Sequence, residues 1–234
     1  MKYVRMSAVN LRRVCAAGVL AAAVAVAAQP AVMPAASAQP CPDVDVVFAR
    51  GTNDTPGLGR VGTAFVNALQ SLRPDRTFAT YAVNYPASFD FLAAGDGAVD
   101  ASRHIRAMAQ QCPSTRFVLG GFSQGAAVVD MLVGIPPLGN KVDAVGSRLG
   151  DVGIAAPLGA DLADNIAALA VFGNPATKFS NPLTSAPPPF GARAIDLCSD
   201  GDPICSRGRN PFAHGRYEQP DYADQAAAFV GAFL

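Results

Sequence analysis

Apolar residues along this chain form two kinds of pattern that alternate with each other. Short apolar or β-branched runs, typical of buried strands, occupy residues 44–48, 77–83, 117–119, 167–172 and 192–197. Apolar positions at helical spacing follow most of these runs. Two such patterns are built on Val61, Phe65, Ala68, Leu69 and Leu72 and on Ala98, Ala101, Ile105, Met108 and Cys112, and two more cover the segments 124–135 and 222–234. Because strands that alternate with helices form a parallel sheet covered on both faces, the pattern predicts an α/β fold.

Two segments, 136–165 and the Pro-rich residues 181–189, show no clear period. We expect both to run over the surface of the fold, with short helices at most. We assign them no chemistry.

The first residues have the composition of an export signal. An apolar run over 14–28 is followed by a small-residue cleavage pattern, Ala36-Ser37-Ala38, and it is preceded by four basic residues, Lys2, Arg5, Arg12 and Arg13. The apolar run is shorter than the ~20 residues that span a bilayer, so a membrane anchor is the weaker interpretation. We therefore predict a secretory signal peptide over 1–38 and one folded domain over 39–234. Arg12-Arg13 is also compatible with the twin-arginine export route, but any signal sequence carries basic residues there.

Removal of residues 1–38 changes the charge balance. It takes away four of the 18 basic residues and none of the 18 acidic ones, which leaves 14 basic against 18 acidic residues and a net charge of −4. A mildly acidic chain without basic clusters is a poor nucleic-acid binder. We expect no nucleic-acid partner.

Export also changes the interpretation of the cysteines. The mature part contains Cys41, Cys112, Cys198 and Cys205, an even set in a compartment where disulfides persist. Four cysteines allow three pairings, and we favour 198 with 205 as a local loop and 41 with 112 as a long one. A zinc site is the competing interpretation, but the chain has no CxxC pair and only two histidines. We expect no metal.

One short stretch carries the candidate chemistry. Gly121-Phe122-Ser123-Gln124-Gly125 lies between the apolar run 117–119 and the helical segment 124–135. A tight turn between a strand and a helix would present the serine hydroxyl beyond the carboxyl end of the strand, where ligands bind in open α/β sheets. The following helix favours an oxyanion at its amino end. The alternative is a glycine-rich packing turn whose serine merely caps the helix.

A nucleophilic serine needs a base and a group that orients the base. The chain has two histidines. His104 lies on the flank of a helical stripe and is best explained as an exposed or half-packed residue, so we choose His214, in the loop after the last strand. Between Ser123 and His214, Asp200 and Asp202 compete as the acid, and spacing alone does not decide between them.

Three motifs stand at characteristic separations: the GFSQG stretch, the loop in which Cys198 and Cys205 enclose Asp202, and Ala49-Arg50-Gly51-Thr52 after the first strand. Together they resemble the cutinase family, especially the cutinase-like proteins of mycobacteria and related actinobacteria. The resemblance covers essentially the whole mature chain. It implies a lidless α/β-hydrolase fold, a three-layer sandwich with a central five-stranded parallel sheet, and a catalytic domain with two disulfides.

The resemblance also implies a role for individual residues. Ser123 falls on the family's nucleophile, Asp202 on its acid and His214 on its base, which decides against Asp200. The backbone N–H groups of Thr52 and Gln124 would form the oxyanion hole, with the Thr52 hydroxyl as a third donor. Fungal members usually carry serine where Thr52 stands and often tyrosine where Phe122 stands, and neither departure is expected to remove activity.

We therefore expect a secreted serine carboxylester hydrolase that acts on short- to medium-chain esters, including lipids, without a cofactor. The alternatives are a carbohydrate deacetylase of the acetylxylan-esterase type and a secreted antigenic or binding protein with little turnover. We also expect the protein to be a monomer and to contact a lipid or cell-envelope surface transiently. The acyl-binding surface is expected around Phe89, Phe91, Pro211 and Phe212.

Overall fold

Five strands form one all-parallel sheet at the centre of the fold. The computed structural model describes residues 40–137 and 155–234, so the predicted signal peptide lies outside the described residues. The strands are β1 (Val44–Ala49), β2 (Phe78–Ala82), β3 (Arg116–Phe122), β4 (Ile166–Phe172) and β5 (Ala194–Leu197). Their order across the sheet is β2-β1-β3-β4-β5, and each neighbouring pair runs parallel. The three central strands are buried almost throughout, as apolar runs without alternation predict.

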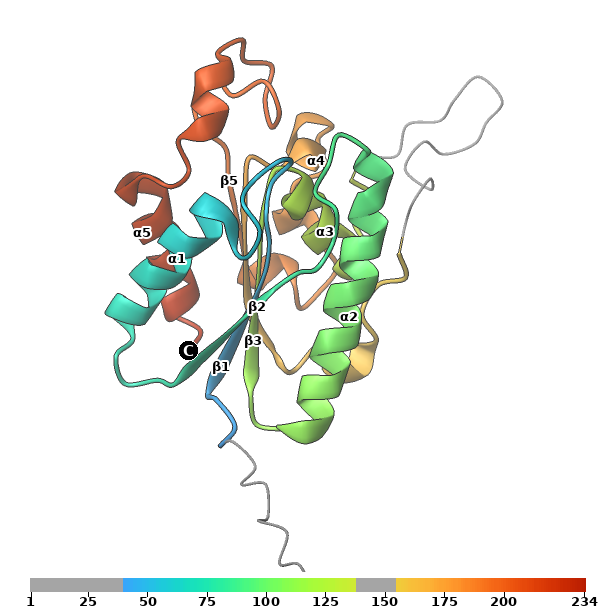
Figure 1. Cartoon of the computed structure of the whole chain (residues 1–234), viewed down its shortest axis with the longest axis vertical. Helices are drawn as coiled ribbons and strands as arrows, with labels where there is room; N and C mark the ends of the chain where they lie inside the picture. The colour runs from blue at the N-terminus through green and yellow to red at the C-terminus, as the bar shows by residue number, and fades with distance from the viewer. Residues whose placement is uncertain (1–39, 138–154) are drawn as a thin grey trace, which may run out of the picture. The chain divides into compact units, whose positions relative to one another are not determined.

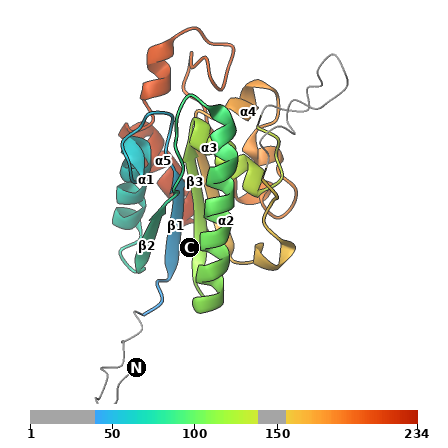
Figure 2. The same ribbon diagram turned by 45° about the vertical axis from the view of Figure 1, so that its right-hand side comes forward.

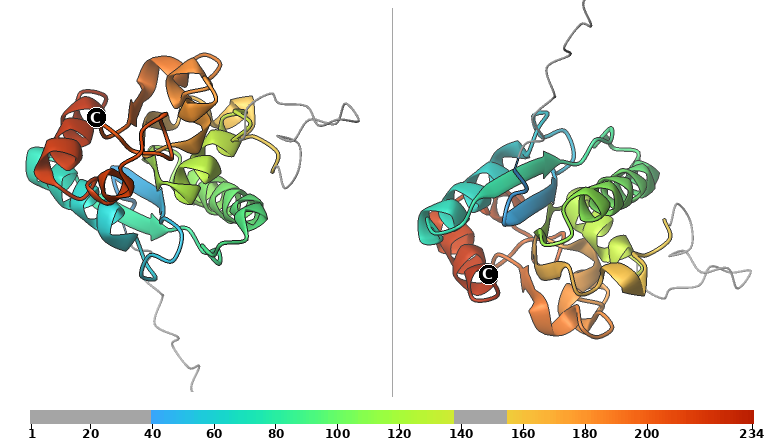
Figure 3. Two further views of the ribbon diagram at one scale, coloured as in Figure 1. Left: turned by 90° about the horizontal axis from the view of Figure 1, so that it is seen from above. Right: turned by 90° about the horizontal axis from the view of Figure 1, so that it is seen from below.

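Helices cover both faces of the sheet, which confirms the predicted three-layer α/β architecture (Figure 1). α1 (Gly59–Leu72) and α5 (Pro220–Gly231) pack together on one face, where the rings of Phe48, Phe65 and Phe172 meet at centroid distances of 5.9–6.4 Å. α2 (Ala94–Gln111), α3 (Gln124–Leu132) and the short α4 (Pro175–Lys178) lie on the other face (Figures 2 and 3). Two apolar cores, one on each face, therefore hold the sheet in place.

The parallel arrangement places four chain segments at one edge of the sheet. Thr52 follows β1, Ser123 follows β3, Gly173 follows β4 and Cys198 follows β5. Backbone hydrogen bonds connect these ends laterally, from Ser123 N to Phe172 O at 2.9 Å and from Gly173 N to Leu197 O at 2.8 Å. Residues that are far apart in the sequence are thereby gathered at the carboxyl edge of the sheet.

The ends of the predicted elements differ from the observed ones by a few residues. The largest difference in a strand is at β3, which the pattern predicts only over 117–119 but which continues to Phe122. The apolar run stops short of the end of the strand because residues 120 and 121 are glycines, which the close passage of Phe48 and α3 requires; a Cβ on Gly120 would lie 2.4 Å from the Phe48 ring. The pattern does not predict α4, because an element this short shows no periodicity. The 3₁₀ turns Ala160–Leu162 and Leu183–Ser185 lie in the two segments where short helices at most were expected.

Two disulfides brace the fold. Cys41 is bonded to Cys112 with a Cα–Cα distance of 5.5 Å, and Cys198 is bonded to Cys205 with a Cα–Cα distance of 5.8 Å. These are the pairs that the sequence analysis favours, and they use every cysteine in 40–137 and 155–234, which removes the thiolates that a zinc site would need. In the same described residues, no helix combines the length and apolar character that crossing a bilayer requires.

Candidate active site

Ser123 occupies the corner between β3 and α3 in a strained backbone conformation. Its φ and ψ angles are 55° and −115°, a region that residues with a side chain rarely adopt. Although Ser123 is the N-cap residue of α3, its side chain makes no capping hydrogen bond. Its Oγ instead lies 2.8 Å from Nε2 of His214. The capping role that the sequence left open is therefore wrong, and the hydroxyl points toward a base.

The two glycines that flank the corner are required by close backbone approaches. A Cβ on Gly121 would lie 2.2 Å from the carbonyl oxygen of Gly125, and a Cβ on Gly125 would lie 1.9 Å from the carbonyl oxygen of Ala49. Any side chain at either position would force β3, α3 and the end of β1 apart. The motif therefore fixes the approach of helix to strand that holds Ser123 in place.

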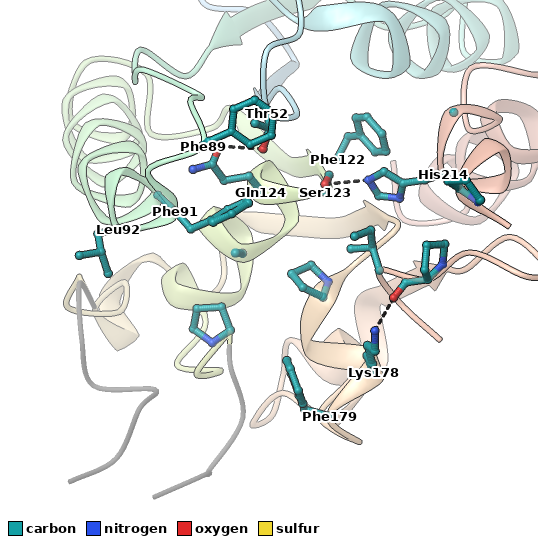
Figure 4. A pocket seen from close by; sticks show the side chains of 18 of the residues that line it. Thr52, Phe89, Phe91, Leu92, Phe122, Ser123, Gln124, Lys178, Phe179 and His214 are labelled. Atoms are coloured by element: carbon teal, nitrogen blue, oxygen red, sulfur yellow. Dashed lines mark hydrogen bonds between the residues drawn. The ribbon is translucent and has the colours of Figure 1, made fainter. Parts of the chain in front are cut away.

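The structure brings Ser123, His214 and Asp202 into one hydrogen-bonded chain. His214 lies in the 3₁₀ turn Pro211–Gly215, and its Nε2 faces Ser123 Oγ (Figure 4). Its Nδ1 lies 2.8 Å from Oδ2 of Asp202. The competing aspartate, Asp200, is exposed, whereas Asp202 is fully buried. The serine, the base and the acid that the sequence singles out thus meet, although 91 residues separate Ser123 from His214.

Hydrogen bonds determine the charge state of Asp202. Burial alone would raise its pKa, but donors from His214, Tyr217 and the backbone N–H of Ile204 outweigh burial and lower the pKa below the usual value for aspartate. Oδ1 accepts from Ile204 N at 2.7 Å, and Oδ2 accepts from His214 and from the Tyr217 hydroxyl at 2.5 Å. Asp202 is therefore ionised at neutral pH and can stabilise a protonated His214.

Thr52 and Gln124 line the same cavity as Ser123. The Thr52 hydroxyl donates to the side-chain carbonyl of Gln124 at 3.1 Å, and the Gln124 amide donates to the backbone carbonyl of Asp90 at 3.1 Å. Among the described residues, no hydrogen bond from the backbone N–H of Thr52 or of Gln124 is present. The hydroxyl of Thr52 is occupied by Gln124 and would have to exchange that partner to act as a third donor.

A cavity of about 610 Å³ opens at Ser123 and His214. Its wall is mainly apolar, with Phe89, Phe91, Leu92, Phe122, Ala127, Met131, Phe179 and Ile204 among the lining residues (Figure 4). Lys178 of α4 also lines it, as does Pro137, which belongs to the segment 136–165 to which the sequence analysis assigns no chemistry; residues 138–154 of that segment lie outside the described residues. Pro211 lines the cavity as expected, but Phe212 is not among the lining residues and is 82% exposed.

Comparison with known proteins supplies the family. The family model for cutinases matches residues 40–234, a range that includes every residue that the structure describes. The chain belongs to the cutinase family. Its architecture is that of the lidless α/β hydrolases, and, as a cutinase-like protein, it is a carboxylic ester hydrolase.

Three similar proteins show how this cutinase relates to others. It is 49% identical over 203 residues to "Phospholipase Culp4" of Mycobacterium tuberculosis, an alignment that covers 87% of this chain and 83% of the relative. A cutinase of Trichoderma reesei, solved with a phosphonate inhibitor, is 32% identical with a TM-score of 0.62 and covers 83% of this chain and 77% of its own. The catalytic core of acetyl xylan esterase from Trichoderma reesei is 25% identical with a TM-score of 0.64 and covers 83% of this chain and 100% of its own.

Sequence reasoning missed two residues of this cutinase that surround His214. Tyr217 is fully buried and donates to Asp202. Gly173 has a φ of +59°, and a Cβ there would lie 2.8 Å from the His214 ring, so only glycine leaves room for the imidazole. The sequence gives a weak signal that Gly173 lies in a turn, since it directly follows the apolar run 167–172 and precedes Asn174-Pro175. Tyr217 has no local signal, because its partner lies in another loop.

Proposed function

We propose that this cutinase is an exported serine carboxylester hydrolase that forms an acyl-enzyme intermediate on Ser123. The single observation that carries the proposal is the hydrogen-bonded chain Ser123–His214–Asp202, with 2.8 Å at each of its two contacts, beside an apolar cavity that Ser123 and His214 line. This is the arrangement in which a serine hydroxyl becomes a nucleophile, because the base that takes its proton is already in contact.

The proposed reaction has two halves. As Ser123 Oγ attacks the ester carbonyl carbon, His214 Nε2 takes the hydroxyl proton, and Asp202 stabilises the resulting imidazolium. The backbone N–H groups of Thr52 and Gln124 bind the carbonyl oxygen as it becomes negative, with the amino end of α3 adding to this field. His214 then gives its proton to the alcohol that leaves, and a water molecule activated by His214 releases the acid from Ser123.

The lining of the cavity favours acyl chains as ligands. An apolar wall binds hydrocarbon by excluding water, and its volume suits a short to medium chain. Three large side chains at this wall, Phe89, Phe91 and Leu92, are 74%, 62% and 53% exposed, so the substrate side of the enzyme also presents apolar groups outward. We therefore propose esters that include lipids as the substrate class, an assignment that the phospholipase name of a 49% identical relative supports.

A carbohydrate deacetylase is the second candidate, since the acetyl xylan esterase of Trichoderma reesei has the same fold at 25% identity. A sugar surface, however, is recognised through many hydrogen bonds, and the wall around Ser123 offers few polar side chains. A binding protein with little turnover is a third candidate. The presence of all three members of the hydrogen-bonded chain argues against it.

We also propose that the protein acts outside the cytoplasm, secreted or associated with the cell envelope, as a monomer. The predicted signal over 1–38 is the first support. The second is the pair of disulfides, because such bonds persist in oxidising compartments.

A substrate series tests the proposal. Turnover is measured on p-nitrophenyl esters of increasing chain length, on acetylated xylan and on phospholipid vesicles, with Ser123→Ala as the blank. We expect hydrolysis of butyrate- to decanoate-type esters that disappears in Ser123→Ala. Release of acetate from xylan without cleavage of longer esters would establish the deacetylase instead, and folded protein without any turnover would establish the binding protein.

A further inference from the structure

The Tyr217 hydroxyl contacts three residues of the loop that carries Asp202. Its hydroxyl donates to Oδ2 of Asp202 at 2.5 Å and accepts the backbone N–H of Ser199 at 2.9 Å. The same hydroxyl lies 3.3 Å from Sγ of Cys205. The loop closed by the Cys198–Cys205 disulfide is therefore held at its beginning, middle and end by one buried oxygen.

The two donors to Asp202 converge on one carboxylate oxygen. Oδ2 receives both the Tyr217 hydroxyl and Nδ1 of His214, whereas Oδ1 receives only the backbone N–H of Ile204. A carboxylate that loses one of two donors on the same oxygen is held less firmly against rotation about its last side-chain bond, and it also becomes a stronger base. Both changes bear on how Asp202 holds His214.

The Tyr217 ring provides a second route to His214. It meets the imidazole edge-on, with the ring centroids 6.1 Å apart and the planes at 83°. It also packs against Phe122, directly before the serine, at a centroid distance of 5.7 Å. One side chain thus contacts the acid through its oxygen, and both the base and the neighbour of Ser123 through its ring.

We propose that Tyr217 is a positioning residue for ester hydrolysis, which fixes the Asp202 carboxylate and keeps the proton of the His214–Asp202 hydrogen bond on the imidazole. The proposal rests on the proposed function, because it assigns Tyr217 a role in the same serine mechanism. A residue that served packing alone would need only the ring. The oxygen is the part of Tyr217 that the proposal requires.

Deletion of that oxygen tests the proposal. We expect Tyr217→Phe to lower kcat about tenfold with little change in KM, since a hydrogen bond to a charged group contributes about that factor. The titratable groups that face Tyr217 and Asp202 are His214 and Tyr222. Without its tyrosine donor, Asp202 binds the imidazolium more strongly, so His214 keeps its proton to higher pH. The acidic limb of kcat/KM should therefore move to higher pH.

Tyr222→Phe is the matched control. Tyr222 lies on α5 with its ring 5.1 Å from that of Tyr217, and no hydrogen bond joins it to Asp202 among the described residues. The substitution removes the same atom one ring farther from the site, and we expect kcat and the pH profile to stay unchanged. Equal effects of the two substitutions would overturn the proposal.

Two further variants make the test independent of folding losses. With 3,5-difluorotyrosine at position 217, the ring is kept and the hydroxyl becomes a stronger donor, so the acidic limb of kcat/KM should move to lower pH. An unmoved limb contradicts the proposal.

In an Asp202→Asn background, Tyr217→Phe should no longer change kcat, whereas an equal loss in both backgrounds would show that Tyr217 does not act through Asp202. Active-site titration with a fluorophosphonate normalises each rate to folded enzyme.

A failure of the proposed function would give a different result from a failure of the role of Tyr217. Full activity of Ser123→Ala would overturn the serine mechanism itself. An inactive Ser123→Ala together with a fully active Tyr217→Phe would leave the mechanism in place and overturn only the role of Tyr217.

Discussion

Both histidines of this cutinase are hydrogen-bonded to a buried aspartate, yet their surroundings differ. His104 Nε2 lies 2.7 Å from Asp45, and His214 Nδ1 lies 2.8 Å from Asp202. The two imidazoles are also similarly exposed, at 20% and 22% of their side-chain surface. Distance and burial alone would therefore make the two pairs equivalent.

The difference lies in what the rest of each ring meets. His104 lies flat against Tyr81, with ring centroids 3.6 Å apart and the planes within 5°, and the Tyr81 hydroxyl is itself tied to Asp100. His214 has a serine hydroxyl on its second nitrogen and a cavity beside it. Asp45 also lies near the amino end of β1, whereas ligands bind at the carboxyl ends of parallel strands. A histidine–aspartate pair thus becomes a candidate site only through its location and its third partner.

The largest predicted effect separates the two histidines by activity. We expect His214→Ala and Ser123→Ala each to lower turnover by something on the order of 10⁶-fold, and the double variant to be scarcely worse, because the residues act as one unit. His104→Ala should retain turnover per folded molecule. Steady-state kinetics with purified protein give the comparison, and additive losses in the double variant would contradict a shared function.

The two disulfides extend the comparison, since Cys41–Cys112 joins the segments that carry Asp45 and His104, and Cys198–Cys205 encloses Asp202. Loss of the short bridge lets Asp202 shift, and a displacement of about 1 Å can cost ~10²-fold in rate. In the chain-entropy model the long bridge contributes about 4 kcal/mol and the short one about 2.5 kcal/mol to stability. We expect Cys198→Ala/Cys205→Ala to lose turnover with a modest loss in Tm.

Removal of the other bridge should have the opposite result. Cys41→Ala/Cys112→Ala should melt much earlier and stay active when cold. Thermal melts and kinetics at low temperature check both halves, and an unchanged kcat without the short bridge would contradict its role in holding Asp202.

The pH dependence should separate catalysis from folding. kcat/KM should fall about tenfold per pH unit on the acid side of neutrality, as His214 takes up a proton and ceases to be a base. Asp202 has a lowered pKa in the folded state, so its contribution to stability is complete above about pH 4 and is lost as the pH falls through the lower folded value. Activity should therefore disappear well above the pH at which circular dichroism reports unfolding. A flat rate profile from pH 5 to 9 would count against His214.

The smallest effect concerns the stability of the second pair. One oxygen of Asp45 already lacks a hydrogen-bond partner among the described residues, and His104→Ala would leave the other without its partner as well. We expect a loss of about 1–3 kcal/mol in the free energy of unfolding, the usual cost of a buried unsatisfied acceptor. His104→Gln, which keeps a donor, should lose less in the same denaturant titration. Equal stability of both variants and the parent would show that the pair contributes nothing.

Much of this fold follows from local pattern, because each strand of a buried parallel sheet is a continuous apolar run with a turn signal after it. The choice of Ser123 as the candidate nucleophile follows for the same reason, since the motif around it is local in sequence and Gly121 is required by its close approach to Gly125. The base follows by elimination between two histidines. The choice of the acid needed the resemblance, since the burial of Asp202 and its contact with His214 are decided by the folded loop and leave no local signal in the sequence.

The parts that the sequence did not predict arise between distant segments. The hydrogen bond from Tyr217 to Asp202 depends on how two loops fold over each other, and the wall formed by α4 depends on a helix too short to have a period. The partner of His104 was missed for the same reason, because Asp45 lies 59 residues away in a strand that otherwise looks apolar.

The most direct measurement is the reaction with a fluorophosphonate, followed by intact-protein mass and peptide mapping. We expect one adduct per chain on the peptide that contains Ser123, formed at the parent rate in His104→Ala and far more slowly in His214→Ala. Folded protein that remains unlabelled, or an adduct on any other residue, would contradict the assignment of Ser123 as the nucleophile.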